Sequence, residues 1–418
     1  MTNHGKTLLM IAFEFPPSSG ASVPRIESFY RYLKQWGWNV VVLTASPKAY
    51  QRVDNSYQDN EDDLVYRAMA LDVPRHLSIK GKYLSSMEMP DRWGLTWIPC
   101  ALVKGKKLLK QYKPDVIWSS SPIPSTHYIA QKLSSEGSIP WVADYRDPFH
   151  YMNGSAGKRL DKQHKKIDSQ TLKQASKLTF ATLQVRDLYC KEYGDLVSEK
   201  SMVIENGFDE SNFKKLAELP AMECPFSPNK FSFYYSGVLY AHGRDPKPIF
   251  SALALLQHEG KINEDNFELI FQGAGDGQDF LHHLDGLGIA KLVKFIPPVS
   301  FIHALSNMMQ CSALLLIQDE RFNKQIPGKL YEYLRTQKPL LVKSPRGSAT
   351  QSLASKYERV ESCYTEAECK SALVKLISNQ DNEIKRELSE HNREHKAKQL
   401  HDTLLTLSLI HISEPTRL

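Results

Sequence analysis

Short apolar runs alternate with amphipathic segments along the first half of the chain. Residues 8–13 and 39–44 are apolar enough for buried strands, and residues 23–36 carry apolar side chains at helical spacing. The same alternation predicts further strands at 115–118, 141–144, 178–182 and 202–205, with helices near 127–134 and 158–175. Apolar strands that alternate with helices favour a parallel sheet covered on both faces.

The second half repeats this rhythm after a passage rich in loop-forming residues. Residues 206–230 contain Pro220, Pro225 and Pro228, which predicts a domain boundary between a first domain, 1–205, and a second, 206–381. The pattern then predicts strands at 231–236, 267–272, 293–296, 313–317 and 339–342, and helices at 246–258, 280–287, 301–309 and 366–377. Two doubly wound α/β domains of similar size follow.

The C-terminal part divides into a charged helix and an unusual tail. Residues 382–399 are rich in Glu, Lys and Arg and predict a helix within a segment, 382–406. Residues 407–418 resemble the conceptual translation of a sequencing-library adapter, and an ordinary amphipathic tail is the alternative. We therefore expect that the native gene was cut near Thr406, which leaves the true C-terminus open, and we exclude the tail from the predicted fold.

Composition narrows the class of protein. The 418 residues are 41% hydrophobic and 24% charged, with a net charge of +6, as in a globular protein of two or three domains. The N-terminal apolar run is too short to span a membrane, and a cytoplasmic location is expected. Six scattered cysteines lack metal-ligand spacing, so reduced thiols and no metal site are predicted.

One stretch, residues 325–342, combines a loop, a short helix and a strand. Lys329 lies in the predicted first helical turn, where a cation is unfavourable against the helix dipole unless an anion binds there. Glu332 follows on the same face, where its carboxylate could bind a vicinal diol. The alternative is an ordinary surface Lys–Glu pair worth a few tenths of a kcal/mol.

Charged and glycine-containing segments follow other predicted strands. Gly20 lies in the first strand-to-helix loop and is followed by Arg25; Asp144, Arg146 and Asp147 end a strand. The three charged groups could equally form a structural ion-pair cluster, and His127 could be an ordinary helix histidine. In the second half, the corresponding positions after strands are Gly237, Arg244, Gly275 and Val299. An Arg at a helix start suits a diphosphate because its guanidinium binds it in a bidentate manner.

Two of these segments carry a family resemblance. Pro327, Lys329 and Glu332 resemble the donor-site motif of retaining glycosyltransferases of family 4, in the branch that makes bacterial surface polysaccharides. The segment 144–149, Asp-Tyr-Arg-Asp-Pro-Phe, is similar to another motif of that branch, with Phe149 in place of Trp. The first Glu of the usual family motif falls at Lys324, which leaves the contacts to the donor sugar open. Within this family, Asn206-Gly-Phe-Asp209 corresponds to a turn at the domain junction.

The resemblance implies the GT-B fold, in which two Rossmann-like domains face each other across a cleft and the final helix returns to the first domain. It assigns Asp147, Arg244 and Lys329 to catalysis. The acceptor side would contain Arg25, His127, Asp144 and Arg146. The donor would contact Gly20, Gly237, Arg244, Gly275, Val299, Pro327, Gly328, Lys329, Leu330 and Glu332.

The implied activity is transfer of a sugar, with retention, from a UDP- or GDP-linked donor to a lipid-linked glycan. No metal or cofactor is needed, because cationic side chains and helix N-termini can stabilise the leaving diphosphate. A nucleotide-sugar epimerase of the same fold is one alternative. A non-catalytic sugar-nucleotide-binding subunit is another, and Lys324 keeps it open.

Basic clusters in the first half suggest a further partner. Lys104, Lys106, Lys107 and Lys110 are interleaved with Leu102, Leu108, Leu109 and Tyr112, and a second cluster lies within 158–166. Such runs are usually solvated helix faces. The first could instead lie on an anionic membrane, which predicts peripheral association with the inner face of the membrane. No nucleic-acid-binding pattern is present.

Overall fold

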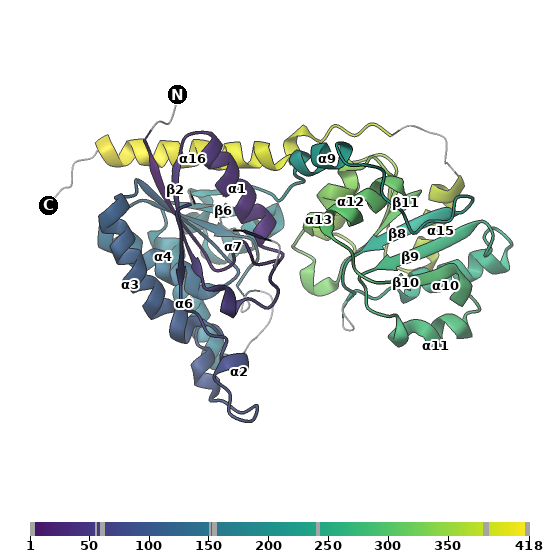
Figure 1. Cartoon of the computed structure of the whole chain (residues 1–418), viewed down its shortest axis with the longest axis horizontal. Coiled ribbons are helices and arrows are strands. Elements are labelled where there is room, and N and C mark those ends of the chain that lie inside the picture. Colours follow the sequence, from purple (N-terminus) through teal and green to yellow (C-terminus); the bar gives the residue numbers. More distant parts are fainter. Residues whose placement is uncertain are drawn as a thin grey trace. The chain divides into compact units, whose positions relative to one another are not determined.

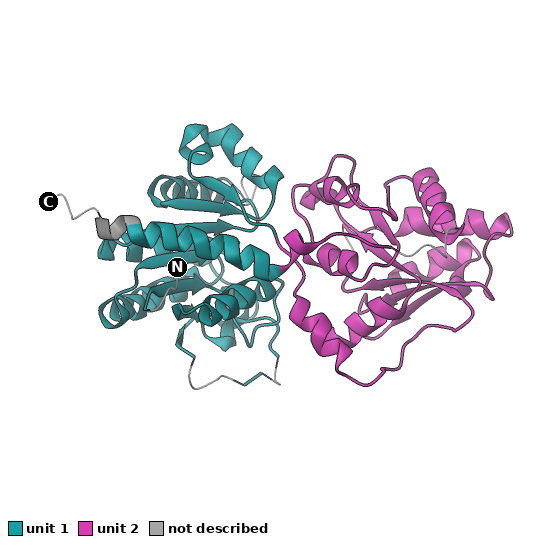
Figure 2. Ribbon diagram, turned by 90° about the horizontal axis from the view of Figure 1, so that it is seen from above, with its two compact units in different colours: residues 1–205, 393–418 teal, residues 206–392 magenta. Residues whose placement is uncertain are grey.

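The computed structural model describes residues 5–54, 57–58, 63–149, 152, 157–239, 243–378 and 384–413. It divides the chain into two compact units, each of them α/β (Figures 1 and 2). Unit 1 contains residues 1–205 and 393–418, and unit 2 contains residues 206–392. In the described part of the chain, no helix is both long and apolar enough to cross a membrane.

Unit 1 is built on a parallel sheet of seven strands in the order β3-β2-β1-β4-β5-β6-β7. Its strands are β1 (Thr7–Ala12), β2 (Asn39–Ala45), β3 (Val65–Ala68), β4 (Val116–Ser120), β5 (Trp141–Tyr145), β6 (Lys177–Phe180) and β7 (Ser201–Val203). Its helices are α1 (Val23–Gln35), α2 (Val73–His76), α3 (Gly94–Tyr112), α4 (Pro124–Gly137), α6 (Lys158–Gln174), α7 (Leu183–Tyr193), α8 (Asp195–Ser198) and α16 (Arg393–Ser413).

Both faces of this sheet are buried, as continuous apolar strands require. Leu9 and Ile11 of β1 face a core shared with α3, α4 and α6, whereas Leu8 and Met10 face the opposite core. That second core includes residues of α1 and α16, which lie over the same face of the sheet (Figure 1).

Unit 2 repeats the design with six parallel strands in the order β10-β9-β8-β11-β12-β13. The strands are β8 (Phe231–Ser236), β9 (Phe267–Gln272), β10 (Val293–Ile296), β11 (Ala313–Ile317), β12 (Leu340–Lys343) and β13 (Val360–Cys363). The helices are α9 (Glu210–Ala217), α10 (Lys247–His258), α11 (Gln278–Gly286), α12 (Phe301–Gln310), α13 (Gly328–Arg335), α14 (Ala349–Ala354) and α15 (Glu366–Ser378). A hydrophobic core packs against each face of this sheet.

The C-terminal helix begins later than the sequence predicts, at Arg393 rather than at residue 382. The segment before it is held by Arg386, which is buried in unit 2. Its guanidinium donates hydrogen bonds to backbone carbonyls of Leu334, Lys338 and Glu358 at 3.0–3.3 Å. These tertiary bonds override the helical preference of the local sequence. The proposed boundary at 381–382 lies outside the described residues.

Helix α16 packs on unit 1 and continues past Thr406. Its His401 accepts a hydrogen bond at Nδ1 from Trp38 Nε1 at 3.0 Å, and Lys396 lies 3.2 Å from the Glu205 carboxylate. Leu407 and Ser408 are buried, and Lys6 donates to the Ser408 carbonyl at 3.3 Å. Excluding these two positions from the fold was therefore wrong. The adapter origin of the tail stays a prediction, and residues 414–418 lie outside the described residues.

The structure also corrects the apolar face predicted for the basic cluster on α3. Leu108 is buried in the core of unit 1, and Leu102, Leu109 and Tyr112 pack against that core. Lys106 pairs with Glu136 of α4 at 2.9 Å. The leucines between the lysines are therefore unavailable to a membrane, because they are the packing face of the helix.

A buried ion pair joins distant segments of unit 1. Arg25 of α1 donates from Nη2 to Asp144 Oδ1 at 2.8 Å and from Nε to Oδ2 at 3.2 Å, and both side chains are almost fully buried. The guanidinium also donates to the carbonyls of Ile204 and Glu205 at 2.8 and 2.9 Å. The pair therefore connects α1, β5 and the chain leaving β7.

Hydrogen bonds complete the environment of this carboxylate. Ser120 of β4 donates to Oδ2 at 2.8 Å, and Thr179 of β6 donates to Oδ1 at 2.6 Å. Burial disfavours the charged carboxylate, but Arg25 and these two hydroxyls outweigh that effect and hold the pKa of Asp144 below its usual value. The charge is thus fully compensated inside the protein.

We expect Asp144→Asn to lower the free energy of unfolding by about 3–5 kcal/mol, because it leaves the Arg25 charge buried and uncompensated. Denaturant unfolding monitored by circular dichroism measures this. Glu136→Gln, in the exposed pair with Lys106, is the matched control and should cost less than about 1 kcal/mol.

The pH dependence gives the same test a second readout. Because the folded pKa of Asp144 is depressed, its contribution to stability is present above the unfolded pKa and is lost as pH falls through the folded pKa. Asp144→Asn should lack this acid-dependent loss. Equal costs for Asp144→Asn and Glu136→Gln would contradict a stabilising role for the pair.

Candidate functional site

The candidate donor site in unit 2 is built where several strands of its sheet end. Helix α13 begins at Gly328, with Pro327 preceding its first turn, so Lys329 lies at the start of the helix as the sequence predicts. The Lys329 ammonium donates to the carbonyl of Ser236, the last residue of β8, at 2.6 Å. It also lies 4.7 Å from the centre of the Tyr235 ring.

Lys329 has no carboxylate within 4 Å in the part of unit 2 that the structure describes. The pKa of Lys329 is lowered to about 7, chiefly by burial and also by nearby Arg244, while Glu332 opposes the shift. Lys329, Arg244 and Glu332 therefore lie close enough to influence one another. A partly buried cation beside a second cation, with no ion pair of its own among the described residues, is suited to bind an anion.

Gly237 fits this arrangement because no larger residue would. Its φ is +114°, and a Cβ atom there would lie 2.8 Å from Lys329 Nζ. Arg244 donates from Nη1 to the carbonyl of Val238 at 3.0 Å, which holds its guanidinium beside the same loop. Residues 240–242, between Gly237 and Arg244, lie outside the described residues.

Asp319 and Arg321 extend the charged cluster and are not among the predicted site residues. They follow β11, and Arg321 donates to Asp319 Oδ2 at 2.6 and 2.9 Å. Burial opposes the charge of Asp319, but Arg321 and, to a smaller degree, Arg244 hold its pKa below the usual value. Gly243 is required here because a Cβ atom would collide with the Asp319 carboxylate.

The other predicted donor residues differ in whether they are accessible to a ligand. Gly275 has φ +96° with open space where a Cβ would be, and Val299 is exposed in the loop after β10. Strands β9 and β10 run parallel to β8, so the loops that follow them lie at the same carboxyl edge of the sheet. Leu330 is fully buried, and its N–H is bonded to the Pro327 carbonyl at 3.0 Å, so its role is packing. Lys324 is half-buried in the loop before α13.

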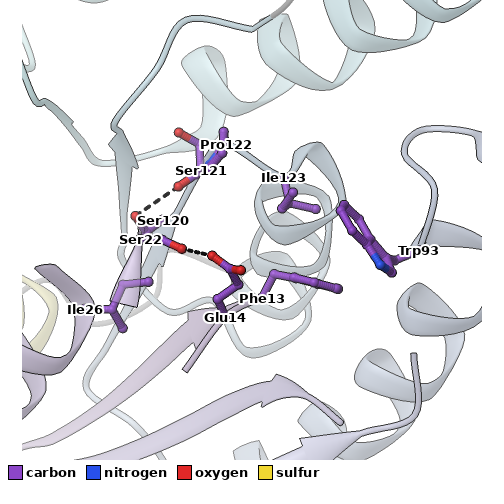
Figure 3. Close-up of a pocket in the computed structure, with 9 residues that line it drawn as sticks. All are labelled: Phe13, Glu14, Ser22, Ile26, Trp93, Ser120, Ser121, Pro122 and Ile123. Carbon is purple, nitrogen blue, oxygen red and sulfur yellow. Dashed lines mark hydrogen bonds between the residues drawn. The ribbon is translucent and has the colours of Figure 1, made fainter. Parts of the chain in front are cut away.

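In unit 1 a cavity of about 100 Å³ lies at the carboxyl ends of β1 and β4 (Figure 3). Glu14 and Ser22 line it, and Trp93 and Phe13 form aromatic walls. Its remaining lining residues are Ile26, Ser120, Ser121, Pro122 and Ile123. A carboxylate, hydroxyls and aromatic rings around one cavity are suited to a neutral ligand rich in hydroxyl groups.

The Glu14 carboxylate lies against the loop that contains Gly20. It accepts a hydrogen bond from the Ser22 hydroxyl (Figure 3) and another from the Ser18 hydroxyl at 3.3 Å. A Cβ atom on Gly20 would collide with the Glu14 carboxylate. The sequence predicts that Gly20 admits a donor phosphate, but in this arrangement an anion there would meet a carboxylate. Only the position of Glu14 directly after a strand could have drawn attention to it.

The predicted acceptor residues fall into two groups. Arg25 and Asp144 bond each other inside the fold, whereas the structural alternative drawn from the sequence paired Asp144 with Arg146 and Asp147. His127 is also buried, among Trp141, Tyr145 and Phe149. Burial lowers its pKa to about 3, with Asp144 opposing, so its imidazole is neutral.

The Ser119 hydroxyl connects two buried rings. Ser119 Oγ accepts from Trp141 Nε1 at 2.8 Å and forms a hydrogen bond with His127 Nδ1 at 2.8 Å. His127 Nε2 has no hydrogen-bond partner among the described residues. A buried, neutral imidazole in an aromatic cluster is a packing element of the core.

Asp147 and Arg146 form the second group, in the loop directly after β5. Burial raises the pKa of Asp147, Arg146 opposes the shift at 4.0 Å, and Asp144 adds to it. The Arg146 backbone N–H donates to Ser121 Oγ at 3.1 Å, which ties this loop to the cavity wall. A partly exposed carboxyl group with a raised pKa is suited to accept a proton.

The comparisons with known proteins agree with this architecture. Residues 24–212 match the family model Glycosyltransferase Family 4. No curated protein matches the sequence. The similarity to the family model therefore covers most of unit 1 and the first residues of unit 2, rather than the whole chain.

Solved structures match nearly the whole length at low identity. α,α-Trehalose 6-phosphate synthase from Burkholderia multivorans is 12% identical, covers 100% of both chains and gives a TM-score of 0.62. HepE from Anabaena, in complex with UDP, is 13% identical over 98% of each chain, with a TM-score of 0.58.

UDP-GlcNAc 2-epimerase from Methanocaldococcus jannaschii is 13% identical over 96% of this chain and 99% of that chain, with a TM-score of 0.57. At such identities the likeness shows the fold alone. The predicted fold class, α/β with two Rossmann-like domains of GT-B type, is therefore confirmed, and residues 24–212 add a sequence similarity to glycosyltransferase family 4.

Proposed function

We propose that the protein is a glycosyltransferase that uses a nucleoside diphosphate sugar as its donor. The observation that carries the proposal is the partly buried Lys329 ammonium, which lacks a carboxylate partner in the described part of unit 2 and lies beside Arg244 and Gly237. The match of residues 24–212 to glycosyltransferase family 4 and the GT-B fold support it.

In this proposal Lys329 and Arg244 bind the donor diphosphate and stabilise the negative charge that develops as it leaves. Both cations are already positioned, so little reorganisation accompanies the reaction, and we propose that transfer needs no metal ion. Gly237 lets the phosphates approach the backbone closely. Pro327 and Gly328 set the start of α13, and Glu332 binds the ribose hydroxyls.

The loops containing Gly275 and Val299 offer backbone groups to the base, which leaves UDP and GDP equally compatible. We assign the acceptor to unit 1. Its sugar would bind in the cavity lined by Glu14 and Ser22, with Trp93 packing against the ring. Asp147 would accept the proton of the attacking hydroxyl because its raised pKa makes it the stronger base of the two strand-end aspartates.

The finer substrate assignments rest on the resemblance of the motifs 144–149 and 327–332. These assignments are that the anomeric configuration is retained, that the acceptor is a lipid-linked glycan of surface polysaccharide synthesis, and that the enzyme acts in the cytoplasm at the inner face of the membrane. The anomeric configuration of the product, determined by nuclear magnetic resonance, tests retention directly.

Two observations keep other functions in view. A UDP-GlcNAc 2-epimerase shares the fold at a TM-score of 0.57, so epimerisation of a nucleotide sugar is a second candidate. Lys324 replaces the first Glu of the family motif, which is compatible with a subunit that binds a sugar nucleotide without turning it over. Incubation with UDP- and GDP-sugars separates the three functions by product: a glycoside, an epimer or unchanged donor.

Lys329→Ala and Glu332→Ala should each weaken nucleotide binding by more than about 1 kcal/mol, because each variant loses a charge-assisted hydrogen bond. Isothermal titration calorimetry with UDP and with GDP measures the change. Lys291→Ala and Glu264→Ala, in an exposed pair 2.8 Å apart on unit 2, are the controls and should leave affinity unchanged.

Unchanged affinity in both site variants would contradict the proposed donor site.

Sugar transfer should also persist in excess EDTA, since Arg244 and Lys329 provide the positive charge. A complete loss that Mg²⁺ or Mn²⁺ restores would contradict that assignment.

Nucleotide affinity should fall as pH rises through about 7, the pKa of Lys329 in the unliganded protein. A bound diphosphate favours the protonated ammonium, so binding is strongest below that pKa and weakens by up to about tenfold per pH unit above it. Lys329→Arg retains its charge and should show a flatter profile. Identical profiles for wild type and Lys329→Arg would assign the pH dependence elsewhere.

Glu14→Gln should raise the KM for the acceptor severalfold and leave nucleotide affinity unchanged, because Glu14 lines the cavity in unit 1 only. Initial-rate kinetics with varied acceptor measures this. Glu136→Gln serves as the control in the same unit. An unchanged acceptor KM in Glu14→Gln would place the acceptor outside this cavity.

A further inference from the structure

A short hairpin in unit 1 exposes large apolar side chains. It comprises residues 77–86, next to α2, and we call it the α2 hairpin (Figure 1). Ile79 and Lys82 exchange both backbone hydrogen bonds, at 2.9 and 3.0 Å, and form an antiparallel bridge. Lys80 and Gly81 between them have φ values of +51° and +75°. Positive φ at both central residues is the pattern of a type I′ turn.

The apolar residues of this hairpin face solvent. Ile79 is 79% exposed and Leu84 is 71% exposed, more than any other large hydrophobic residue in the described parts of the chain. Tyr83 between them is 38% exposed. Every residue from 79 to 86 is exposed. These side chains stabilise no core, so their exposure carries a cost that folding alone does not explain.

The hairpin also carries positive charge at its tip. Lys80 and Lys82 are exposed, and neither has a carboxylate within 4 Å among the described residues. Type I′ turns favour Asn, Asp or Gly at the position of Lys80, because a residue with a longer side chain adopts positive φ less readily. A lysine there is poorly explained by turn geometry and well explained by its charge.

We propose that the α2 hairpin is the part of the protein that contacts an anionic lipid bilayer. Ile79 and Leu84 enter the interface between headgroups and acyl chains, Tyr83 lies at headgroup level, and Lys80 and Lys82 bind lipid phosphates. Two exposed aliphatic side chains flanking unpaired lysines complement this surface in both polarity and charge. The proposal deepens the proposed function, because a lipid-linked acceptor requires the enzyme at the membrane.

The hairpin and the basic cluster of α3 are distinct candidates for this contact. On α3 the leucines between the lysines pack inward, and Val103 is the exposed apolar side chain beside the lysines in the described residues. The hairpin offers apolar insertion in addition, and its binding should therefore persist partly at ionic strengths that screen surface charges. This difference separates the two surfaces experimentally.

The test is co-sedimentation of the full-length protein with liposomes of phosphatidylcholine, with and without phosphatidylglycerol. Wild type should bind the anionic liposomes. The double variant Ile79→Ser/Leu84→Ser should lose about tenfold or more in affinity, because two aliphatic side chains no longer insert. Leu255→Ser, at an exposed leucine of α10 in unit 2, should bind as wild type does.

The charge contribution is tested with the turn preserved. Lys80→Asn creates the favoured Asn-Gly turn and removes one charge. Combined with Lys82→Ser, it should reduce the preference for phosphatidylglycerol without lowering the melting temperature. Replacing Lys104, Lys106, Lys107 and Lys110 with Ser should have the smaller effect and should act mainly at low salt.

Several results would overturn the proposal. Wild type that ignores anionic liposomes at low salt would do so. So would unchanged binding by Ile79→Ser/Leu84→Ser, or loss of binding confined to the α3 variant. If instead light scattering shows self-association that Ile79→Ser/Leu84→Ser removes, the hairpin contacts a second copy of the chain. Titration of the same variants with UDP and GDP tests the proposed function independently, because the hairpin substitutions should not change nucleotide affinity.

Discussion

The buried pair of Arg25 and Asp144 is the interaction on which the carboxyl edge of the first sheet depends. One guanidinium and one carboxylate join a helix, three strands and the segment that leaves unit 1 for unit 2. Burying these charges is favourable only because nearly every donor and acceptor is matched. This pair also supports the cavity in unit 1. Ile26 of the cavity wall belongs to the same helix as Arg25, Ser22 precedes that helix, and Ser120 donates a hydrogen bond to Asp144.

The two units treat buried charge in opposite ways. In unit 1 the charge of Asp144 is compensated within the protein, and His127 is kept neutral in an aromatic core. In unit 2 the partly buried Lys329 lies beside a second cation, Arg244, and among the described residues its ammonium donates to the Ser236 carbonyl. The first arrangement stabilises a framework. The second stores an electrostatic cost that a bound anion would relieve.

Local sequence predicted the parts of the fold that depend on local patterns. The strand at residues 8–13 and the helix start at Lys329 were recognisable because apolar runs and helix-start residues act over a few positions. The edge strands β3 and β13 escaped prediction, since both are short and mostly half-buried and so lack a continuous apolar run. Helix α9 escaped because its neighbourhood is rich in proline.

The site was harder to predict, because its partners are far apart in sequence. The Arg25–Asp144 pair spans 119 positions, so the sequence did not reveal it and offered Arg146 as the partner of Asp144 instead. Glu14 lies within eight positions of Ser22, yet the folded loop at Gly20 is what brings them together. Lys329 was identifiable from its helical position, whereas its low pKa depends on burial and on Arg244.

Unit 2 is inserted within unit 1, because residues 393–413 return to pack on α1 after 206–392 have formed a separate sheet. During synthesis the ribosome therefore releases the covering helix of unit 1 only after unit 2. Until then Leu8, Met10 and Phe29 lack the apolar surface of Leu400 and Leu404 that completes their core. Unit 2 can finish folding while unit 1 is still open, so an aggregation-prone nascent chain is a direct result of this topology.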